Sequence, residues 1–467
     1  MDDEALYDVR RWSKQTFGAC RLADERHRKR VIEIGAILAQ RPADSLSAAC
    51  GTDEAARLGG YRLIENDRVN PDAIAEGGFA ATVERADDVR RMLAASDTTT
   101  LSFSHAASLS LGDVGGPKAC NVHGWHVHSS LLINADGPMV IGLIDQQWRC
   151  RDPAGRGRKH QRKQRAYNEK ESFKWQATSV RLSQRLGPVL DRVIELCDAE
   201  ADVYEFLDYK VTNNQRFIVR VSQNRCLSDA DEKPWTHLGQ QEALGQITVN
   251  VPQRGGRVAR QATLTLRAAQ VTLRPPSRLV GPQLEPLTLN AVLVEELSCP
   301  SDAEPLHWRL YTGEPAQTFE QVKQVTLDYG QRWQVEDFHK AWKSGCKVEE
   351  QRQQTPCNLQ RMAQIRAFVA TRLLQLKQHA TLAPETPCEP LLDRVTWKCL
   401  YLSTEKDSRS LPDKPPSQRW ALHAVARLGG WNDSKHTGRP GWAALIRGWD
   451  ALQSRITGYR LALAGPL

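Results

Sequence analysis

Three acidic residues lie far apart along the chain but at positions where they could meet. Asp97 is at the end of a predicted strand in LAASDTTTLS, and Asp198 directly follows the apolar run VIELC. Glu336 lies in a predicted helix. Strand ends in mixed α/β sheets bring together side chains from non-adjacent strands, so these carboxylates could surround divalent ions. Two such ions roughly 4 Å apart can activate a water or a 3′-hydroxyl and stabilise the leaving oxygen of a phosphodiester.

Each acid also has a plainer interpretation. An Asp in a strand-to-helix turn more often caps the helix that follows, and Glu200, Asp202 and Glu205 are nearby competitors for the role of Asp198. The presence of all three acids on the expected elements favours the metal site.

The stretch YGQRWQVEDFHKAWKSG, from Tyr329 to Gly345, surrounds one carboxylate with cations and aromatic rings. Together with the preceding TFEQVKQVTLD it has the composition of a helix. At about 100° per residue, one face of such a helix carries Tyr329, Arg332, Glu336 and Lys343, flanked by Trp333 and Lys340. A carboxylate among a phenol, a guanidinium and ammonium groups suits phosphate and metal together.

The rest of the sequence predicts the elements that would position these groups. Residues 1–70 are expected to form short helices, and from about residue 90 three strands precede helix, strand, helix and strand. This is the order expected of a ribonuclease H-like mixed sheet, an α/β fold. An all-β stretch at about 216–310 looks like an insertion, and further helices follow it. We expect domain limits at 1–70, 71–368 and 369–467.

Composition narrows the class of protein. The 467 residues are 40% hydrophobic and 25% charged, and the net charge of +8 matters mainly where it clusters. No apolar run suggests a signal peptide or a membrane span. Eleven cysteines without a CxxC pair predict reduced, cytosolic thiols. His123, His126 and His128 alternate along a strand and are interpreted as structural imidazoles.

The acids and the pattern Y-x2-R-x3-E-x6-K resemble the DDE transposases of the bacterial insertion-sequence-four family, with the Tn-five-like members most similar. Other stretches agree along almost the whole chain, among them GGYRLIEN, GWHVHSSLL, KESFKW, NQRFIVR, LTLNAV, LYTGEP, FHKAWKSG, NLQRM, TRLLQLK and ARLGGWNDSKHTG. The resemblance implies a cut-and-paste transposase that nicks transposon ends, forms and opens a hairpin, and joins the end to target DNA. Residues 1–70 would bind the ends, 71–368 would be catalytic, and 369–467 would dimerise.

The resemblance also assigns roles to residues. Asp97, Asp198 and Glu336 would hold two Mg²⁺ ions per active site, with Mn²⁺ able to substitute. Tyr329, Arg332 and Lys343 would grip phosphates. Trp308 would receive a flipped base, although bare sequence favours a core aromatic, and Trp333 has the same two interpretations. The remaining expected DNA contacts are Arg26, Arg30, Arg220, His339, Lys340, Arg352, Asn358 and Lys435.

Some features depart from the family. Gln40 and Arg41 replace a Lys-Tyr pair, so end specificity should differ. The basic run at 156–165 replaces an acidic loop, and it is equally consistent with DNA contact and with a solvated loop. The cations that follow Asp24, a predicted helix cap, likewise fit either phosphate contact or a solvated basic face.

The expected partners are double-stranded DNA, as transposon ends and target, and a second copy of the chain in a paired-end complex, with no membrane. The last helix would contact that copy, or its apolar stripe is ordinary core. Two other functions stay open. A different ribonuclease H-like metal-dependent nuclease would keep the acids without needing Tyr329 or Trp308, and a domesticated DNA-binding derivative would be free to lose an acid.

Overall fold

The computed structural model describes the chain apart from residues 1–5, 115–121, 151–164, 229–231, 252, 254–258, 278–282, 302, 390, 406–409, 435–436 and 464–467. Within the part described, no helix combines the length and apolar character needed to cross a membrane. The cysteines among the described residues are all free thiols.

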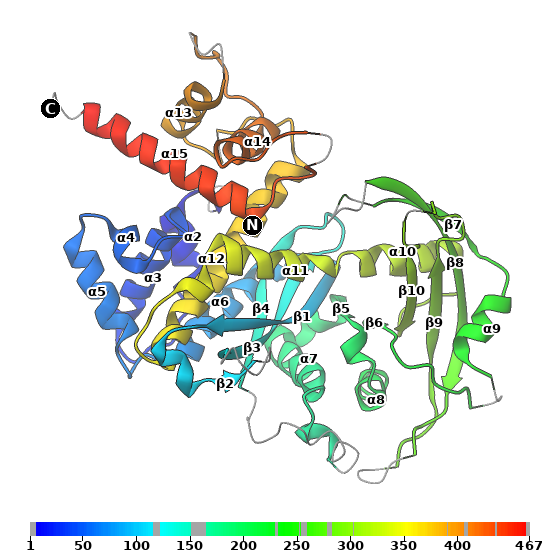
Figure 1. Cartoon of the computed structure of the whole chain (residues 1–467). Helices are drawn as coiled ribbons and strands as arrows, with labels where there is room; N and C mark the ends of the chain where they lie inside the picture. The colour runs from blue at the N-terminus through cyan, green and yellow to red at the C-terminus, as the bar shows by residue number, and fades with distance from the viewer. Residues whose placement is uncertain are drawn as a thin grey trace.

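A mixed sheet forms the centre of the molecule (Figure 1). Its middle strands lie in the order β4, β3, β1, β5, β6, with β3 antiparallel to β1 and β4, and β5 parallel to β1 and β6. This arrangement confirms the predicted ribonuclease H-like sheet of three antiparallel strands followed by two parallel additions. The bounds are β1 (Met92–Phe103), β2 (Gly112–Asp113), β3 (His123–Asn134), β4 (Val140–Arg149), β5 (Val193–Cys197) and β6 (Phe217–Arg220).

Helices cover both faces of this sheet, and the alternation of side chains along the strands decides which residues meet them. On β1, Met92 and Ala94 pack with α7, whereas Leu93 and Ala95 face the core that includes α11 and α12. The helices α7 (Phe173–Leu186) and α8 (Tyr204–Thr212) therefore lie on one face, as Figure 1 shows.

The predicted insertion continues the same sheet instead of forming a separate one. Strand β10 pairs with β6, and β9, β8 and β7 follow outward from β10. The segment also contains a short helix, and its first predicted residues, 217–220, form β6 of the central sheet. The bounds are α9 (Pro234–Gln240), β7 (Gly245–Val251), β8 (Arg260–Leu273), β9 (Leu287–Glu295) and β10 (His307–Thr312).

The expected single helix from Tyr329 to Gly345 is wrong. Helix α10 (Phe319–Gly330) ends at a glycine, and α11 (Trp333–Lys340) begins after a tight turn in which Gln331 and Arg332 donate to carbonyls three residues back. A π-helical turn, η8 (Ala341–Gly345), follows α11 directly. Glycine at the end of α10 has low helix propensity, which is the local reason for the break.

The N-terminal helices are fixed to the central sheet through one long helix, α12 (Pro356–Leu382). Its buried Arg361, Arg366 and Arg372 donate to backbone carbonyls of the N-terminal segment, at positions that include Ile64, Pro42 and Ala39. Several of these carbonyls lie at helix ends, where no intrahelical donor exists. The N-terminal helices are α2 (Val9–Phe17), α3 (Glu25–Gln40), α4 (Leu46–Cys50), α5 (Glu54–Ile64) and α6 (Pro71–Ala86).

The C-terminal helices pack beside α11 and the turn that follows it. Trp442 Nε1 donates to Asp337 Oδ1 at 2.8 Å, and Lys377 Nζ of α12 binds the other oxygen at 2.9 Å. The predicted domain limit at 368/369 falls inside α12, so the limits themselves stay a prediction. The last helices are α13 (Arg394–Thr404), α14 (Gln418–Leu428) and α15 (Trp442–Leu463).

Candidate active site

Strand alternation places two of the predicted acids on the same face of the sheet. Asp97 on β1 continues the row of Leu93 and Ala95, and Asp198 continues the row of Ile194 and Leu196 on β5. The strands are parallel, and each acid comes two residues after the paired Ala95 and Leu196, so both lie at the same end of the paired segment. Strand β1 itself continues to Phe103, so the prediction that Asp97 ends its strand is wrong. Helix α11 covers this face and supplies the third acid, Glu336, from its first turn.

The guanidinium of Arg332 lies between two of these acids. Its Nη2 is 2.6 Å from Glu336 Oε1, and its Nη1 is 3.7 Å from Asp97 Oδ2. Arg332 is the residue immediately before α11, and the i, i+4 spacing to Glu336 in the first turn brings the two side chains together. One cation therefore partly neutralises both acids.

Asp97 has an unusually high pKa for a carboxyl group. Burial first, then the charge of Asp198 and to a smaller extent that of Glu336, raise the pKa of Asp97 to about 6 against the opposing effects of Arg332 and the Thr98 N–H. Burial likewise raises the pKa of Asp198. Asp97 thus lies close enough to Asp198 and Glu336 for their charges to act on it, and such perturbed carboxyl groups are common at functional sites.

Asp198 also caps a turn, the alternative use considered from the sequence. Its Oδ1 accepts from Glu200 N at 2.8 Å at the start of η7 (Ala199–Ala201). Among the residues that the structure describes, no three His, Cys, Asp or Glu side chains are spaced to hold one metal ion as they stand. The oxygen donors suit Mg²⁺ chemically, but Arg332 would have to leave the space between Asp97 and Glu336 for a cation to enter.

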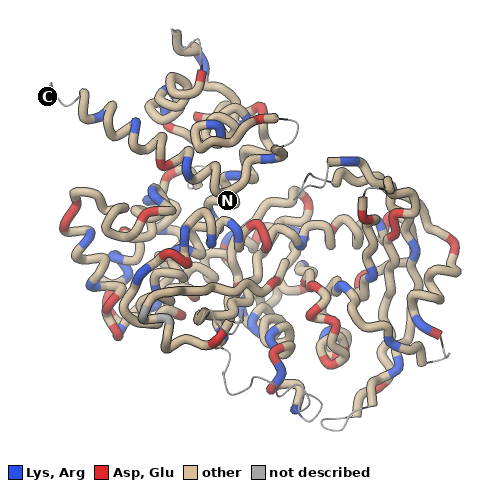
Figure 2. The backbone as a smooth tube through the Cα atoms, viewed as in Figure 1, with Lys and Arg blue, Asp and Glu red and all other residues tan. Residues whose placement is uncertain are grey.

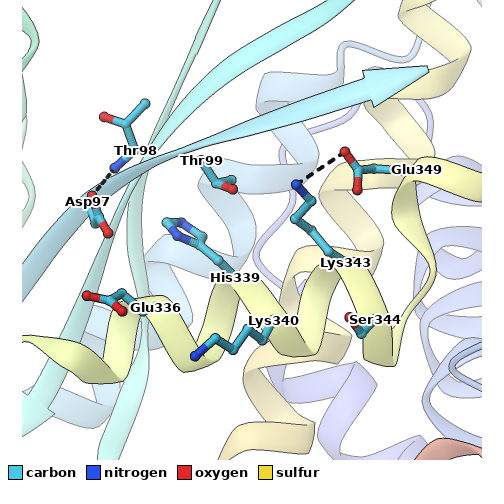
Figure 3. A pocket seen from close by; sticks show the side chains of 9 residues that line it. All are labelled: Asp97, Thr98, Thr99, Glu336, His339, Lys340, Lys343, Ser344 and Glu349. Carbon is cyan, nitrogen blue, oxygen red and sulfur yellow. Dashed lines mark hydrogen bonds and ion pairs between the residues drawn. The ribbon is translucent and has the colours of Figure 1, made fainter. Parts of the chain in front are cut away.

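A pocket of about 470 Å³ opens beside these acids (Figure 3). The chain supplies its walls from β1, from α11 and η8, and from the short turn η9 (Val348–Glu350). The lining residues are Asp97, Thr98, Thr99, Glu336, His339, Lys340, Lys343, Ser344 and Glu349. Asp97 and Glu336 lie at one end of the pocket and Glu349 lies beside Lys343 at the other, with Lys340 and Lys343 on the helix between them, an arrangement that suits a phosphate chain next to a cation (Figure 3).

The predicted phosphate-binding residues of this helix differ in their surroundings. Lys340 is exposed, and Lys343 Nζ donates to Thr100 O at 2.8 Å. His339 is buried, and burial followed by the charge of Lys343 lowers its pKa to about 3. Near neutral pH His339 therefore offers a hydrogen-bonding ring and no charge.

Aromatic side chains form a second group next to the acids. The ring of Trp308 on β10 packs edge-on against Tyr329, with centroids 5.4 Å apart. Arg220 on β6 lies directly opposite Leu310 on β10. Leu310 comes two residues after Trp308, so the side chains of Arg220 and Trp308 lie on the same face of the sheet. Burial raises the pKa of Tyr329 to about 12, and the charges of Arg332 and Arg220 oppose this rise. The exposed Trp333 begins α11.

The remaining predicted contacts are scattered around this centre. Arg352 is exposed, whereas Asn358 is buried and its Oδ1 accepts from Arg361 Nη1 at 2.8 Å, so Asn358 supports the fold where it stands. Lys435 and residues 156–164 of the basic run lie outside the described residues. The structure therefore brings the acids, Arg332, His339, Lys340 and Lys343 together, with Trp308, Tyr329 and Arg220 adjacent.

In the N-terminal segment, basic positions along the backbone are interspersed with acidic ones (Figure 2). Asp24 caps α3 as expected, and it also binds Arg26 at 2.7 Å, while Arg30 binds Glu33 at 2.6 Å. Arg26 is 88% exposed, so its pairing with Asp24 is weak in water and can be exchanged for a phosphate.

The sequence did not single out two charged groups near the acids. Glu349 lines the pocket, and Lys174 of α7 binds Glu200 at 2.5 Å and opposes the raised pKa of Asp198. Lys174 lies within KESFKW, a stretch that already resembled the family, and this was the available signal. For Glu349 only its place after the Y-x2-R-x3-E-x6-K pattern was visible.

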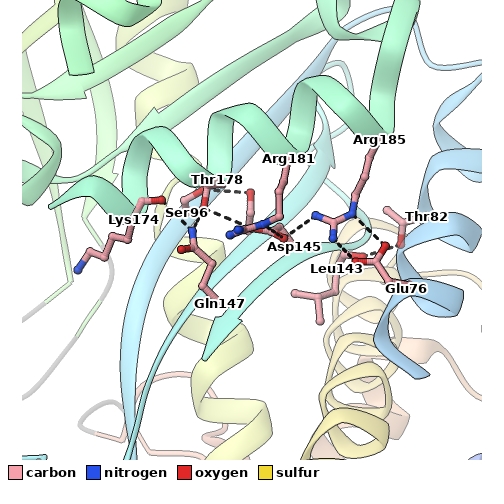
Figure 4. A network of polar contacts seen from close by, with 11 residues as sticks. Glu76, Thr82, Ser96, Leu143, Asp145, Gln147, Lys174, Thr178, Arg181 and Arg185 are labelled. Atoms are coloured by element: carbon pink, nitrogen blue, oxygen red, sulfur yellow. Dashed lines mark hydrogen bonds and ion pairs between the residues drawn. The ribbon is translucent and has the colours of Figure 1, made fainter. Parts of the chain in front are cut away.

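A buried polar network positions Lys174 (Figure 4). Asp145 of β4 accepts from Arg181 Nε at 2.9 Å and from Arg185 Nη1 at 2.5 Å, which holds α7 against the sheet. Gln147, two residues further along β4, donates to Lys174 O at 2.8 Å. The network thus fixes the first turn of α7, from which the Lys174 side chain reaches toward Glu200.

Comparisons with known proteins gave a structural alignment over most of the chain and a family match to its N-terminal segment. The cryo-EM structure of a piggyBac transposase synaptic complex with hairpin DNA aligns with 98% of this chain and 81% of that chain, at 11% identity and a TM-score of 0.36. At that score the fold assignment rests on the strand order described above. A family model for transposase DNA-binding matches residues 9–69, from the first residue of α2 to the residue before the cap of α6. Residues 9–69 are thus similar to the DNA-binding domain of transposases.

Proposed function

We propose that this chain is a metal-dependent DNA transposase of the DDE type. The observation that carries the proposal is that the charges of Asp198 and Glu336 act on the buried Asp97, with Arg332 between Asp97 and Glu336. The match of residues 9–69 to a transposase DNA-binding domain supports DNA as the substrate.

In this proposal Asp97, Asp198 and Glu336 hold the divalent ions, which supply activation of the attacking hydroxyl and stabilisation of the leaving oxygen. Arg332 moves from the acids to a phosphate of the DNA end, where its planar fork can bind two oxygens. Lys340 and Lys343 neutralise the phosphates along the pocket. His339 is neutral and lines the pocket beside these lysines, where its ring can form a hydrogen bond without adding charge.

The aromatic group supports the finer proposal of a cut-and-paste reaction with a hairpin intermediate, as in the insertion-sequence-four family. A hairpin requires sharp bending of the DNA end, which is easier when a base leaves the stack. Trp308 is partly exposed next to Tyr329 and lies on the same face as Arg220. A base stacked on Trp308 would place its phosphate near these polar groups.

DNA binding and assembly complete the proposal. Arg26 and Arg30 lie within the matched segment and would contact transposon ends, and target DNA would be the second DNA substrate. The paired-end complex would contain two copies of the chain. The end of α15 supports this, because Tyr459, Leu461 and Leu463 are 47%, 66% and 69% exposed and would be covered by a second copy.

The test uses a duplex that carries the terminal inverted repeat beside the reading frame, here called the end duplex. With Mg²⁺, the full chain should nick the end duplex and produce a hairpin. Glu336→Ala should reduce nicking by roughly a hundredfold or more while the gel shift is unchanged, since loss of a direct ligand exceeds the effect of its supporting residues. Glu320→Ala, an exposed acid on α10, is the matched control.

The same gel separates the alternatives. A plain nick without a hairpin favours another ribonuclease H-like nuclease, and a shift without cleavage favours a domesticated DNA-binding derivative. Cleavage by Glu336→Ala at the rate of the unaltered protein would overturn the assignment of the acids.

A further inference from the structure

Lys343 is held in place by groups from two other segments. Its Nζ donates to Thr100 O on β1 at 2.8 Å and lies 3.3 Å from Glu349 Oε1 in η9. An ammonium has three N–H donors, so two acceptors fix its direction and leave the group able to bind an anion in the pocket that Lys343 lines.

Glu349 is itself anchored to β1. The same atom, Oε1, accepts from Ser102 N at 2.8 Å and from Ser102 Oγ at 2.9 Å. Ser102, Thr100 and Asp97 belong to one strand. Strand β1 therefore carries a predicted metal ligand and, a few residues on, the fixed points of the ammonium group, so the distance between them is set by a rigid element.

The backbone around Glu349 is unusual. Lys343 lies on the π-helical turn η8, and Lys347, which precedes η9, adopts a left-handed conformation with φ of 47°. Such a conformation is uncommon in a residue other than glycine and persists only where surrounding contacts hold it. Both irregularities turn the chain back so that Glu349 reaches β1 beside Lys343.

From these contacts we infer that Glu349 is a positioning residue for the reaction, which orients Lys343 toward the phosphate next to the metal-binding acids. The inference rests on the proposed function. The negative charge of Glu349 partly neutralises the Lys343 ammonium before DNA binds, and Glu349 Oε1 keeps that ammonium at one place on β1. A lysine so fixed need not be ordered when the transition state forms, which is the benefit of preorganisation.

Variants can separate position from charge. Glu349→Gln keeps an oxygen at Oε1 and removes the charge, so the nicking rate at saturating end duplex should stay within about threefold of the unaltered protein. Glu349→Ala removes the acceptor, and we expect a loss of roughly tenfold or more in that rate with end affinity changed less than about threefold. Glu350→Ala, an exposed neighbour in η9, is the control.

A double-mutant cycle with Lys343→Ala excludes a merely structural role. If Glu349 acts through Lys343, then Glu349→Ala should have little further effect on the rate once Lys343 is removed. The inference would be overturned if the rate losses of Glu349→Ala and Lys343→Ala multiplied in the double variant. It would also be overturned if Glu349→Ala left the nicking rate unchanged, or if it reduced the rate and the end affinity equally. Failure of the unaltered protein to nick the end duplex with Mg²⁺ would instead refute the proposed function.

Discussion

The raised pKa of Asp97 predicts that replacing this acid stabilises the protein in the absence of metal. The unfolded chain releases the proton near pH 3.8, whereas the folded protein keeps it until about pH 6. The folded state therefore binds more protons between these values, and stability falls as pH rises through this window. Above it, the ionised carboxylate costs roughly 3 kcal/mol, the free-energy equivalent of that difference in pKa.

Asp97→Asn should remove this cost while keeping the oxygen that accepts from Thr98 N at 2.7 Å. At pH 7.5 in EDTA the variant should be more stable than the unaltered protein by up to about 3 kcal/mol, less what Arg332 loses as a partner. At pH 4 the difference should nearly vanish, because the native carboxyl is then protonated. The midpoint of thermal unfolding, measured from pH 4 to 8, checks both values.

The control is Asp136→Asn, which changes an exposed carboxyl in the turn between β3 and β4. Its effect should not follow the same pH window. Addition of Mg²⁺ or Mn²⁺ should raise the midpoint of the unaltered protein and not that of Asp97→Asn, because only the former binds the ion through this acid. A stability difference that stayed constant from pH 4 to 8 would refute the argument that buried, mutually repelling acids form this site.

Two further predictions concern Arg332 and Trp308. The Arg332 guanidinium lies between Asp97 and Glu336, so in the absence of DNA Arg332→Gln should bind Mn²⁺ several-fold more tightly than the unaltered protein. Electron paramagnetic resonance at pH 8 measures this affinity, with Arg352→Gln as the control. Equal affinities would contradict a guanidinium that competes with the metal. Trp308→Ala should nick the end duplex normally but form the hairpin about tenfold more slowly, since one stacked base is worth roughly 1 to 3 kcal/mol. A denaturing gel separates the two products. If the variant lost both products in parallel, a stacking role for Trp308 would be contradicted.

The sequence allowed the central sheet to be predicted because its signals are local. Apolar runs and turn residues mark the strands, and a period of two fixes which residues share a face. Asp97 and Asp198 each extend an alternating row, so their common side of the sheet follows from residue parity once the strands are parallel neighbours. The pairing of β6 with β10 depends on contacts between distant segments and was not visible in either strand alone.

Buried contacts explain most of the differences at the site. Asn358 has the composition of a polar contact residue, yet its amide binds Arg361 beneath the N-terminal segment. His339 would be a cation at low pH in water, but burial keeps it neutral. Glu349 has no sequence feature that distinguishes it from Glu350, and only the fold shows that one reaches Ser102 and the other faces solvent.

Two irregular turns flank α11, and only one of them separates the residues that line the pocket. The tight turn at Gln331 and Arg332 lies before both Glu336 and Lys343, so it does not change their orientation relative to each other. The π-helical turn η8, which contains Lys343, rotates the chain less per residue than an α-helix. Glu336 and Lys343 still line one pocket, and Arg332 keeps the i, i+4 contact with Glu336 that a regular helix would give. The helical spacing in the sequence therefore grouped the right side chains, because the irregular turns leave these local relations in place although the single helix is wrong.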